Sequence, residues 1–405
     1  MTAVTNRRSC STSRARRAEI EVGAGFADIL ALANATEMIS FAGGFPDPAT
    51  FPGEILAGIL QELIHSGDAS ARQYSPTEGL PSTRRFIRER LSHLEGQEPG
   101  DAELLVTSGA IEALELIGKR FLDPGDLVLV EAPTYLGAIM AFRSFESSVL
   151  GVAMDGEGLR VDELQVLLES GSRPKLLYTI PDHQNPAGVS LSQARREALV
   201  QLAREHGVLV VEDVAYRELG FDDTRAPSLW ALAPDVVVQI GTFSKTFFPG
   251  VRLGWAAGPD EVVAELTLAK QNTDQCAGAL GQRLLEEYGR RGGLEAQNRV
   301  ARDLYERRCS ALMSALERHM PAGVEWTTPR GGFFSWVTLP PTVDTLMVAR
   351  VASEAGVAFV PGVHFYADRD RSNDLRLSFS KVEDDRIEEG IHRLGVLIQR
   401  ELTRA

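Results

Sequence analysis

The stretch Thr242–Trp255, which reads TFSKTFFPGVRLGW, decides the fold that we expect for this chain. It follows the apolar, strand-like run Val236–Ile240. The amine of Lys245, placed just after a strand, can form a Schiff base with a carbonyl. The flanking hydroxyls and the guanidinium of Arg252 can hold a phosphate. The remaining lysines lie in charged or turn-like settings, and we expect them on the surface: Lys119, Lys175, Lys270 and Lys381.

The composition is that of a globular protein, with 405 residues, 44% hydrophobic and 24% charged. A chain of this length is expected to form more than one hydrophobic core, because single cores stop growing near about 250–300 residues. The formal charge of -14 argues against general binding to nucleic acids or anionic membranes. No apolar run reaches transmembrane length. The three cysteines share no metal-ligand spacing, so we expect no metal site and reduced thiols in a cytoplasmic protein.

Residues 1–18 are rich in arginine, serine and threonine and contain no acidic residue. We expect a disordered basic tail there. The same composition overlaps with organellar transit peptides, although an apolar secretory segment is missing.

Short apolar runs alternate with helix-period segments through the middle of the chain. This alternation predicts βαβ units and therefore an α/β fold, with a mainly parallel central sheet sandwiched by helices. The expected strands are Glu103–Thr107, Leu127–Glu131, Leu176–Ile180, Val208–Glu212 and Val236–Gly241. The expected helices between them include Ser108–Phe121, Leu136–Phe145 and Ser192–His206.

The last third of the chain has a different pattern. A long charged helical stretch, Ala256–Met320, is followed by apolar strand-like segments and two further helices. We therefore expect a large domain over residues 51–285 and a smaller α+β domain over residues 286–405. Residues 19–50 are expected to form an arm that packs on the small domain or on a partner subunit, with a short amphipathic helix over residues 26–40.

Polar residues follow the predicted strands, where open α/β sheets bind their ligands. Ser108-Gly109-Ala110 opens a helix, and the free amide groups of a helix N-terminus form an anion site. The alternative for this motif is a simple N-cap by Ser108.

Two other segments carry polar groups that suit a pyridine ring. A carboxylate at Asp213 would keep a ring nitrogen protonated, and the phenol of Tyr216 would hydrogen-bond a ring oxygen. Asn185 can donate its amide to the same oxygen. Each has a structural alternative: a helix cap for Asp213 and a Pro/Asn/Gly turn for Pro181–Gly188. Together with Lys245, the pattern indicates pyridoxal phosphate as the cofactor.

Arg376 lies on an apolar, alternating strand, where its guanidinium needs an anion. A clamp on a substrate α-carboxylate is one interpretation, and an edge-strand arginine in solvent is the other. His183 has no evident partner in the sequence, so it is not expected to be a catalytic base.

The chain resembles the class I/II aminotransferases of pyridoxal-phosphate fold type I, from about residue 25 to about residue 400. It is most similar to the branch of 2-aminoadipate and kynurenine aminotransferases and the catalytic half of MocR-type regulators. The resemblance rests on motifs in matching order: ISFAGGFP (39–46), QYSPTEGL (73–80), VTSGA (106–110), EAPTYLG (131–137), HQNPAG (183–188), EDVAY (212–216), residues 241–254 and LRLSFS (375–380).

This resemblance implies roles at the ring end of the cofactor. Lys245 would hold the cofactor as a Schiff base and later move protons, with Asp213 at the pyridine nitrogen. Tyr216 and Asn185 would contact the ring oxygen, and Tyr135 would stack on the ring. Lys245, Asp213 and Tyr216 are thus the expected catalytic residues.

The resemblance also implies roles at the phosphate end of the cofactor and at the substrate. Tyr74 would reach the phosphate of the neighbouring subunit, so a homodimer with shared sites is expected. Gly44, Asn185 and Arg376 would bind the substrate at its carboxylate. The remaining residues around the phosphate would be Ser108, Gly109, Ala110, Thr242, Ser244 and Arg252.

Two departures from the family pattern bear on function. Ala110 stands where many members have a hydroxyl, so one phosphate contact is expected to be lost. Ala27 stands at the position where the aminoadipate-type members that this chain resembles have an arginine. No charged clamp for an acidic side chain is therefore evident, and an apolar, aromatic or specialised substrate is favoured.

We expect an aminotransferase that moves the amino group of an α-amino acid to a 2-oxo acid. One alternative is a pyridoxal-phosphate lyase, decarboxylase or oxidase of secondary metabolism. A less favoured alternative is a MocR-like ligand-sensing module, because residues 1–25 are too short for a winged helix-turn-helix.

Overall fold

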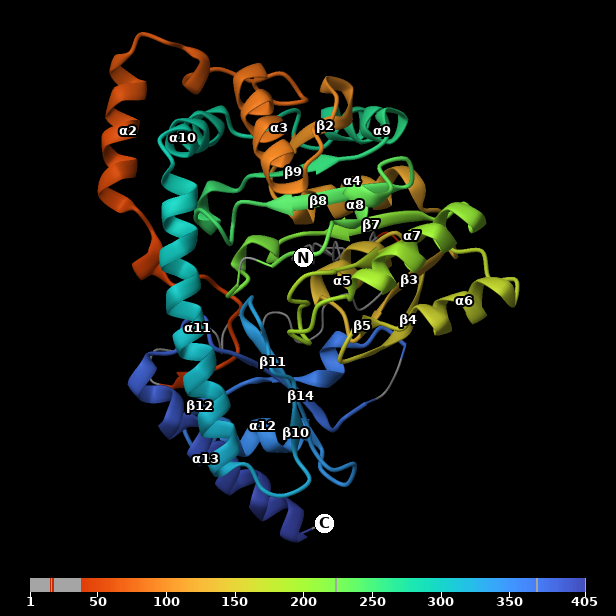
Figure 1. Cartoon of the computed structure of the whole chain (residues 1–405), viewed down its shortest axis with the longest axis vertical. Coiled ribbons are helices and arrows are strands. Elements are labelled where there is room, and N and C mark those ends of the chain that lie inside the picture. Colours follow the sequence, from red (N-terminus) through yellow and green to blue (C-terminus); the bar gives the residue numbers. More distant parts are fainter. Residues whose placement is uncertain (1–14, 16, 18–37, 223, 369–370, 405) are drawn as a thin grey trace, which may run out of the picture.

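The computed structural model describes residues 15, 17, 38–222, 224–368 and 371–404. A large sheet and a small sheet lie at opposite ends of the molecule, and the long helix α11 (Gly293–His319) runs beside both (Figure 1). None of the helices in the described part is both long and apolar enough to cross a membrane.

The large sheet has eight strands in the order β2-β9-β8-β7-β6-β3-β4-β5. Its central neighbours, from β8 to β4, pair in parallel, while β9 and β5 run antiparallel to their neighbours. This arrangement confirms the expected α/β class. The strands are β2 Leu104–Thr107, β3 Leu127–Ala132, β4 Ser148–Asp155, β5 Gly158–Leu159, β6 Leu176–Thr179, β7 Leu209–Asp213, β8 Val237–Thr242 and β9 Gly254–Ala257.

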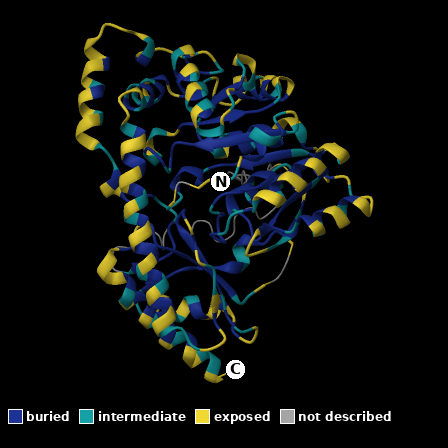
Figure 2. Ribbon diagram, in the orientation of Figure 1, coloured by how far each residue is buried: buried dark blue, intermediate teal, exposed yellow. Residues whose placement is uncertain are grey.

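Helices cover both faces of this sheet, so its strands are buried on both sides. In β3, Val128 and Val130 pack in one hydrophobic core and Leu129 packs in another. Burial on both faces explains why these strands read as continuous apolar runs. Figure 2 shows the buried strands between helices whose outer faces are exposed. The helices before α11 are α2 Gly53–His65, α3 Pro81–Glu95, α4 Ala110–Phe121, α5 Leu136–Arg143, α6 Val161–Glu169, α7 Gln193–His206, α8 Leu229–Leu232, α9 Asp260–Gln271 and α10 Ala279–Arg290.

The small sheet is antiparallel, in the order β10-β11-β14-β13. Arg376 lies on β14, which pairs with β11 on one side and β13 on the other. The edge-strand alternative for Arg376 is therefore wrong. The elements of this region are β10 Glu325–Trp326, β11 Phe334–Thr338, α12 Thr345–Glu354, β12 Val357–Ala358, β13 Val360–Pro361, β14 Asp374–Ser378 and α13 Asp384–Arg404.

The segment that follows residue 38 is anchored to the small sheet. Ile39–Ser40 form β1, which pairs in parallel with β12. The amide of Phe41 donates to the carbonyl of Ala358 at 2.7 Å, and the Phe41 carbonyl accepts from Ser378 at 2.8 Å. Most of the helix expected over residues 26–40 lies outside the described residues, and its end is a strand instead.

The structure corrects the expected helical stretch Ala256–Met320. Its first residues belong to β9, and the rest is divided into α9, α10 and α11. Strand β9 is only four residues long and contains two alanines, so its sequence carries little strand signal. Strand β4, which contains Gly151, was also missing from the prediction.

Two helical glycines provide a test of the packing. A Cβ on Gly395 of α13 would lie 2.2 Å from the carbonyl oxygen of His319, whereas a Cβ on Gly58 of α2 would have nothing within 4 Å. We expect Gly395→Ala to destabilise the protein by about 1–3 kcal/mol through overpacking. Gly58→Ala should stabilise it by about 0.5–1 kcal/mol. Denaturation midpoints under identical conditions test both, and equal shifts would contradict the described α11–α13 contact.

Candidate active site

A cavity of about 270 Å³ lies where the ends of the large-sheet strands meet the β1 segment and the small sheet. Most of the predicted site residues border it, although they come from distant parts of the chain. Those that line the cavity are Gly44, Ala110, Tyr135, Asn185, Asp213, Tyr216, Thr242, Ser244, Lys245, Arg252 and Arg376.

Lys245 follows β8, and its amine borders this cavity. Its Nζ donates to the carbonyl of Gly44 at 2.8 Å, and no carboxylate in the described chain forms an ion pair with it. Burial lowers the pKa of Lys245 to about 8; Arg376 adds to this effect and Asp213 opposes it. A lysine with a lowered pKa is a better nucleophile near neutral pH.

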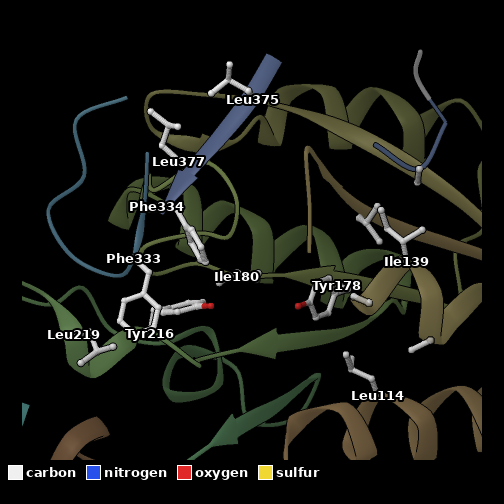
Figure 3. Close-up of a cluster of buried hydrophobic side chains, with 14 of the residues drawn as sticks. Leu114, Ile139, Tyr178, Ile180, Tyr216, Leu219, Phe333, Phe334, Leu375 and Leu377 are labelled. Carbon is white, nitrogen blue, oxygen red and sulfur yellow. The ribbon is translucent and has the colours of Figure 1, made fainter. Parts of the chain in front are cut away.

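Asp213, at the end of β7, is a buried carboxylate held by neutral donors. Its Oδ2 accepts from the Tyr178 hydroxyl at 2.9 Å, and its Oδ1 accepts from the amide of Ala215 at 3.0 Å. Burial raises the pKa of Asp213 to about 6. Figure 3 shows the hydroxyl of Tyr178 directed toward that of Tyr216 across the site. A buried carboxylate without a bound cation suits a ligand that carries a proton.

Arg376 is buried at the other end of the cavity. Its guanidinium donates to Asn185 Oδ1 at 2.9 Å and to the Ala42 carbonyl at 2.7 Å, while Nε has no partner in the described structure. Its Cζ lies 4.3 Å and 4.8 Å from the ring centroids of Phe334 and Phe365. Burial lowers the pKa of Arg376 to about 10. This guanidinium lacks a carboxylate partner within the described chain, which suits binding of an anion.

A third group of polar side chains gathers at the N-terminus of α4. Arg252 donates to Ser244 Oγ at 3.2 Å, and the Thr242 hydroxyl donates to the same oxygen at 3.0 Å. Gly109 has φ 100°, and a Cβ there would lie 2.7 Å from Arg252 Nη2. Glycine is thus required both by the backbone and by the approach of the arginine. Hydroxyls, a guanidinium and a helix N-terminus together suit a phosphate.

Ser108 lies beside this group, but its hydroxyl points elsewhere. It donates to Asp274 Oδ2 at 2.7 Å, and its amide donates to Glu112 Oε2 at 2.6 Å. The N-cap of α4 is Gly109, so the alternative of an N-cap by Ser108 is wrong. Lys270 is fully buried between Glu112 and Asp274, which corrects the expected surface position.

Tyr74 lies outside the cavity and is 80% exposed. Ala27, on which the expected lack of an acidic-side-chain clamp rested, lies outside the described residues. His183 is partly buried and has φ 51°, and desolvation lowers its pKa.

Sequence reasoning missed the residues that join the site loops. The buried carboxylate of Glu131 accepts from Thr179 Oγ1 at 2.5 Å and from Gln184 Nε2 at 2.7 Å. Gln184 also donates to the Pro133 carbonyl at 2.8 Å, so the loop carrying Tyr135 is tied to the loop carrying Asn185. Burial raises the pKa of Glu131 to about 7. Both residues stand inside quoted motifs, but only the folded structure shows that they meet.

Comparisons with known proteins place this chain in a family. The model for aminotransferase class I and II matches residues 37–394. Aromatic-amino-acid aminotransferase 1 of Thermococcus litoralis is 39% identical over 380 residues, which cover 93% of this chain and 91% of that protein.

Two crystal structures are also similar. Pyrococcus horikoshii kynurenine aminotransferase, in complex with PMP, has a TM-score of 0.92 at 39% identity and covers 97% of this chain and 98% of its own. The α-aminoadipate aminotransferase of Thermus thermophilus, complexed with N-(5'-phosphopyridoxyl)-L-leucine, has a TM-score of 0.91 at 37% identity. It covers 98% of this chain and 100% of its own. The chain therefore belongs to the class I and II aminotransferases, and its cofactor is pyridoxal phosphate.

Proposed function

We propose that this aminotransferase takes its amino group from an apolar or aromatic α-amino acid and passes it to a 2-oxo acid. One observation carries the proposal: a lysine of lowered pKa, a carboxylate and a guanidinium share one cavity without pairing with each other. The charged side chains are therefore available to bind the charged groups of a cofactor and of an amino acid.

The lining of the cavity supports the choice of substrate. Its apolar walls include Ile111, Leu136, Phe334 and Phe365. Among the described lining residues the cations are Lys245, Arg252 and Arg376. Each is proposed to serve the cofactor or the substrate α-carboxylate, so none of these remains for an acidic side chain. Two of the similar proteins are named for aromatic amino acids and kynurenine, which agrees with this choice. The Thermus thermophilus protein is named for α-aminoadipate, which has an acidic side chain, although its structure holds a leucine adduct.

The ring end of the cavity fits the cofactor. We propose that Asp213, which has only neutral donors, faces the pyridine nitrogen. Arg376 donates to Asn185 Oδ1. The side-chain nitrogen of Asn185 can then donate to the ring oxygen beside Tyr216. Tyr135 is proposed to pack on the ring face.

The phosphate is proposed to lie against Thr242, Ser244 and Arg252, with the amides of Gly109 and Ala110. This group fits a phosphate because the guanidinium has no carboxylate partner in the described chain, while Gly109 leaves room for Arg252.

Each of these side chains then has a definite task. When bound, pyridoxal phosphate supplies an aldehyde carbon and an electron-accepting ring. Lys245 would hold the cofactor, and its Nζ would act as the general base and acid that moves the proton of the substrate Cα. Asp213 retains the proton on the ring nitrogen. Arg376 orients the substrate by its α-carboxylate, and the phenylalanine rings beside it exclude water.

The lowered pKa of Lys245 predicts a pH dependence of cofactor attachment. Only the neutral amine is nucleophilic, so the attachment rate to the apoprotein should rise through about pH 8. Arg376→Gln removes a positive charge that lowers this pKa, so the midpoint should move to higher pH; Asp213→Asn should move it to lower pH. Stopped-flow absorbance measures the rates. Arg404→Gln, at the exposed end of α13, is the control, and a midpoint that none of the variants shifts would contradict the assignment.

A panel of amino donors against 2-oxoglutarate tests the function. Aromatic and branched apolar donors should give higher kcat/KM than 2-aminoadipate or glutamate, with conversion of the cofactor to its amine form. Lys245→Ala should lose turnover. Arg376→Gln should lower kcat/KM by about 10- to 100-fold, the value of a charged hydrogen-bonded contact. Release of carbon dioxide or ammonia without the amine form of the cofactor would instead indicate a decarboxylase or a lyase.

We further propose a homodimer with shared sites, in which Tyr74 contacts the phosphate bound by the partner subunit. Its exposed side chain, outside its own cavity, supports this. The division into an arm over 19–50, a large domain over 51–285 and a small domain over 286–405 is part of the same proposal. The cytoplasmic location stays a prediction.

Subunit complementation tests the shared site. Tyr74→Ala should weaken cofactor affinity by about tenfold, because one hydrogen bond to a charged group is lost. A mixed dimer of Lys245→Ala and Tyr74→Ala subunits contains one site with both native residues. It should therefore regain cofactor binding of native affinity at one site, measured by titration. If the mixed dimer binds no better than the Tyr74→Ala homodimer, Tyr74 does not act across the interface.

A further inference from the structure

Lys270, on α9, carries a buried charge that the proposed reaction does not use. Its ammonium contacts both oxygens of Glu112 at 2.8 and 2.7 Å and both oxygens of Asp274 at 2.8 and 2.9 Å. The side chain is completely buried. Placing an ammonium there costs several kcal/mol in solvation unless such contacts offset it. An arrangement this costly calls for a reason beyond general packing.

The two carboxylates meet again at a single residue, Ser108. Glu112 Oε2 accepts the Ser108 amide at 2.6 Å, and Asp274 Oδ2 accepts the Ser108 hydroxyl at 2.7 Å. Arg252 Nη2 donates to the Ser108 carbonyl at 3.4 Å. Every polar atom of Ser108 is thus held from outside the turn, and two of the three contacts depend on carboxylates that Lys270 holds together.

Ser108 directly precedes the end of α4 that borders the cavity. Gly109 is the N-cap, and Ala110 and Ile111, the first residues of the helix, line the cavity. The orientation of their amide groups therefore follows from how Ser108 is fixed.

Packing of α4 on α9 does not require these charges. Buried apolar residues already join the two helices in one core: Ala113, Leu116 and Ile117 with Val262, Leu266 and Ala269. Lys119, farther along α4, makes an exposed contact with Thr273 at 3.1 Å and does not reach the turn. The charged contacts are thus directed at the turn rather than spread along the helix pair.

We propose that Lys270, Glu112 and Asp274 form a positioning cluster that fixes the β2–α4 turn so that the amides of Gly109 and Ala110 face the cofactor phosphate. The proposal rests on the phosphate end proposed above. It gives Ser108 a different task from the one the resemblance implies: its hydroxyl anchors the turn to Asp274 and does not bind the phosphate. The hydroxyl that Ala110 lacks is then offset by accurately placed backbone donors.

Removing the ammonium by Lys270→Met leaves Glu112 and Asp274 side by side without a cation. Their repulsion should move them apart, together with the two Ser108 contacts. Asp274→Ala removes the anchor of the hydroxyl but leaves the Lys270–Glu112 pair. Lys119→Met is the matched control, because it removes a lysine from the same helix pair without touching the cluster.

The test compares pyridoxal phosphate with pyridoxal, which has the same ring and aldehyde but no phosphate. Apoprotein is titrated with each, and binding is followed by absorbance. Lys270→Met and Asp274→Ala should raise the Kd for pyridoxal phosphate at least about tenfold, the loss of roughly one charged hydrogen bond, and leave that for pyridoxal within about twofold. The 31P resonance of the bound cofactor should shift in both variants and stay in place in Lys119→Met.

Equal losses for the two ligands would overturn the proposal, because the cluster would then support the fold generally. Unchanged affinity for both ligands would overturn it as well. If the native apoprotein binds neither ligand covalently, the assignment of Lys245 fails, which is a different result.

A double-mutant cycle tests the cluster even where Lys270→Met does not fold. Ser108→Ala and Asp274→Ala should each weaken pyridoxal phosphate binding, and the double variant should be no worse than Asp274→Ala alone, because that substitution already breaks the contact that Ser108→Ala removes. Additive losses would mean that Ser108 binds the phosphate itself, and this would contradict the proposal.

Discussion

The hydrogen bonds of Arg376 are the interaction on which the site depends. The guanidinium starts from β14 of the small sheet, reaches Asn185 in the loop after β6, and also holds the Ala42 carbonyl beside β1. Three segments that lie far apart in sequence therefore meet at one side chain. Arg376 therefore connects the small sheet and the β1 segment to Asn185, at the ring end of the cavity.

The cavity keeps charges in a state that a stable fold would ordinarily avoid. Burial pushes the pKa of Lys245 down to about 8 and that of Asp213 up to about 6, so the two values approach each other. Groups with perturbed pKa values in one cleft are typical of catalytic sites. The surrounding structure supports this state with neutral donors, such as Tyr178, rather than with ion pairs that would neutralise it.

Much of the site could be predicted because its residues stand directly after strands. Asp213 and Thr242 end the apolar strands β7 and β8, and Lys245 follows β8. Parallel strands bring their ends to one edge. The family motifs then suggested the roles that are proposed for these residues.

What the sequence could not show are contacts made between segments. Tyr178 reads as one more core residue of an apolar strand, yet its hydroxyl reaches Asp213. Glu131 and Lys270 look like ordinary charged residues, and only tertiary contacts bury them. Strand β9 was missed because its pairing partners, β2 and β8, define it more than its own alanines do.

The pairing of β8 with β9 has a consequence for how accurately the cofactor can be held. Thr242 and Gly254 are register partners, and the Phe243 amide donates to the Leu253 carbonyl at 3.0 Å. Lys245 and Arg252 therefore stand on one closed loop whose two ends are locked together. Lys245, the proposed covalent anchor of the cofactor, and Arg252, the proposed contact of its phosphate, thus form a single mechanical unit, so movements elsewhere in the enzyme can occur without changing the distance between them.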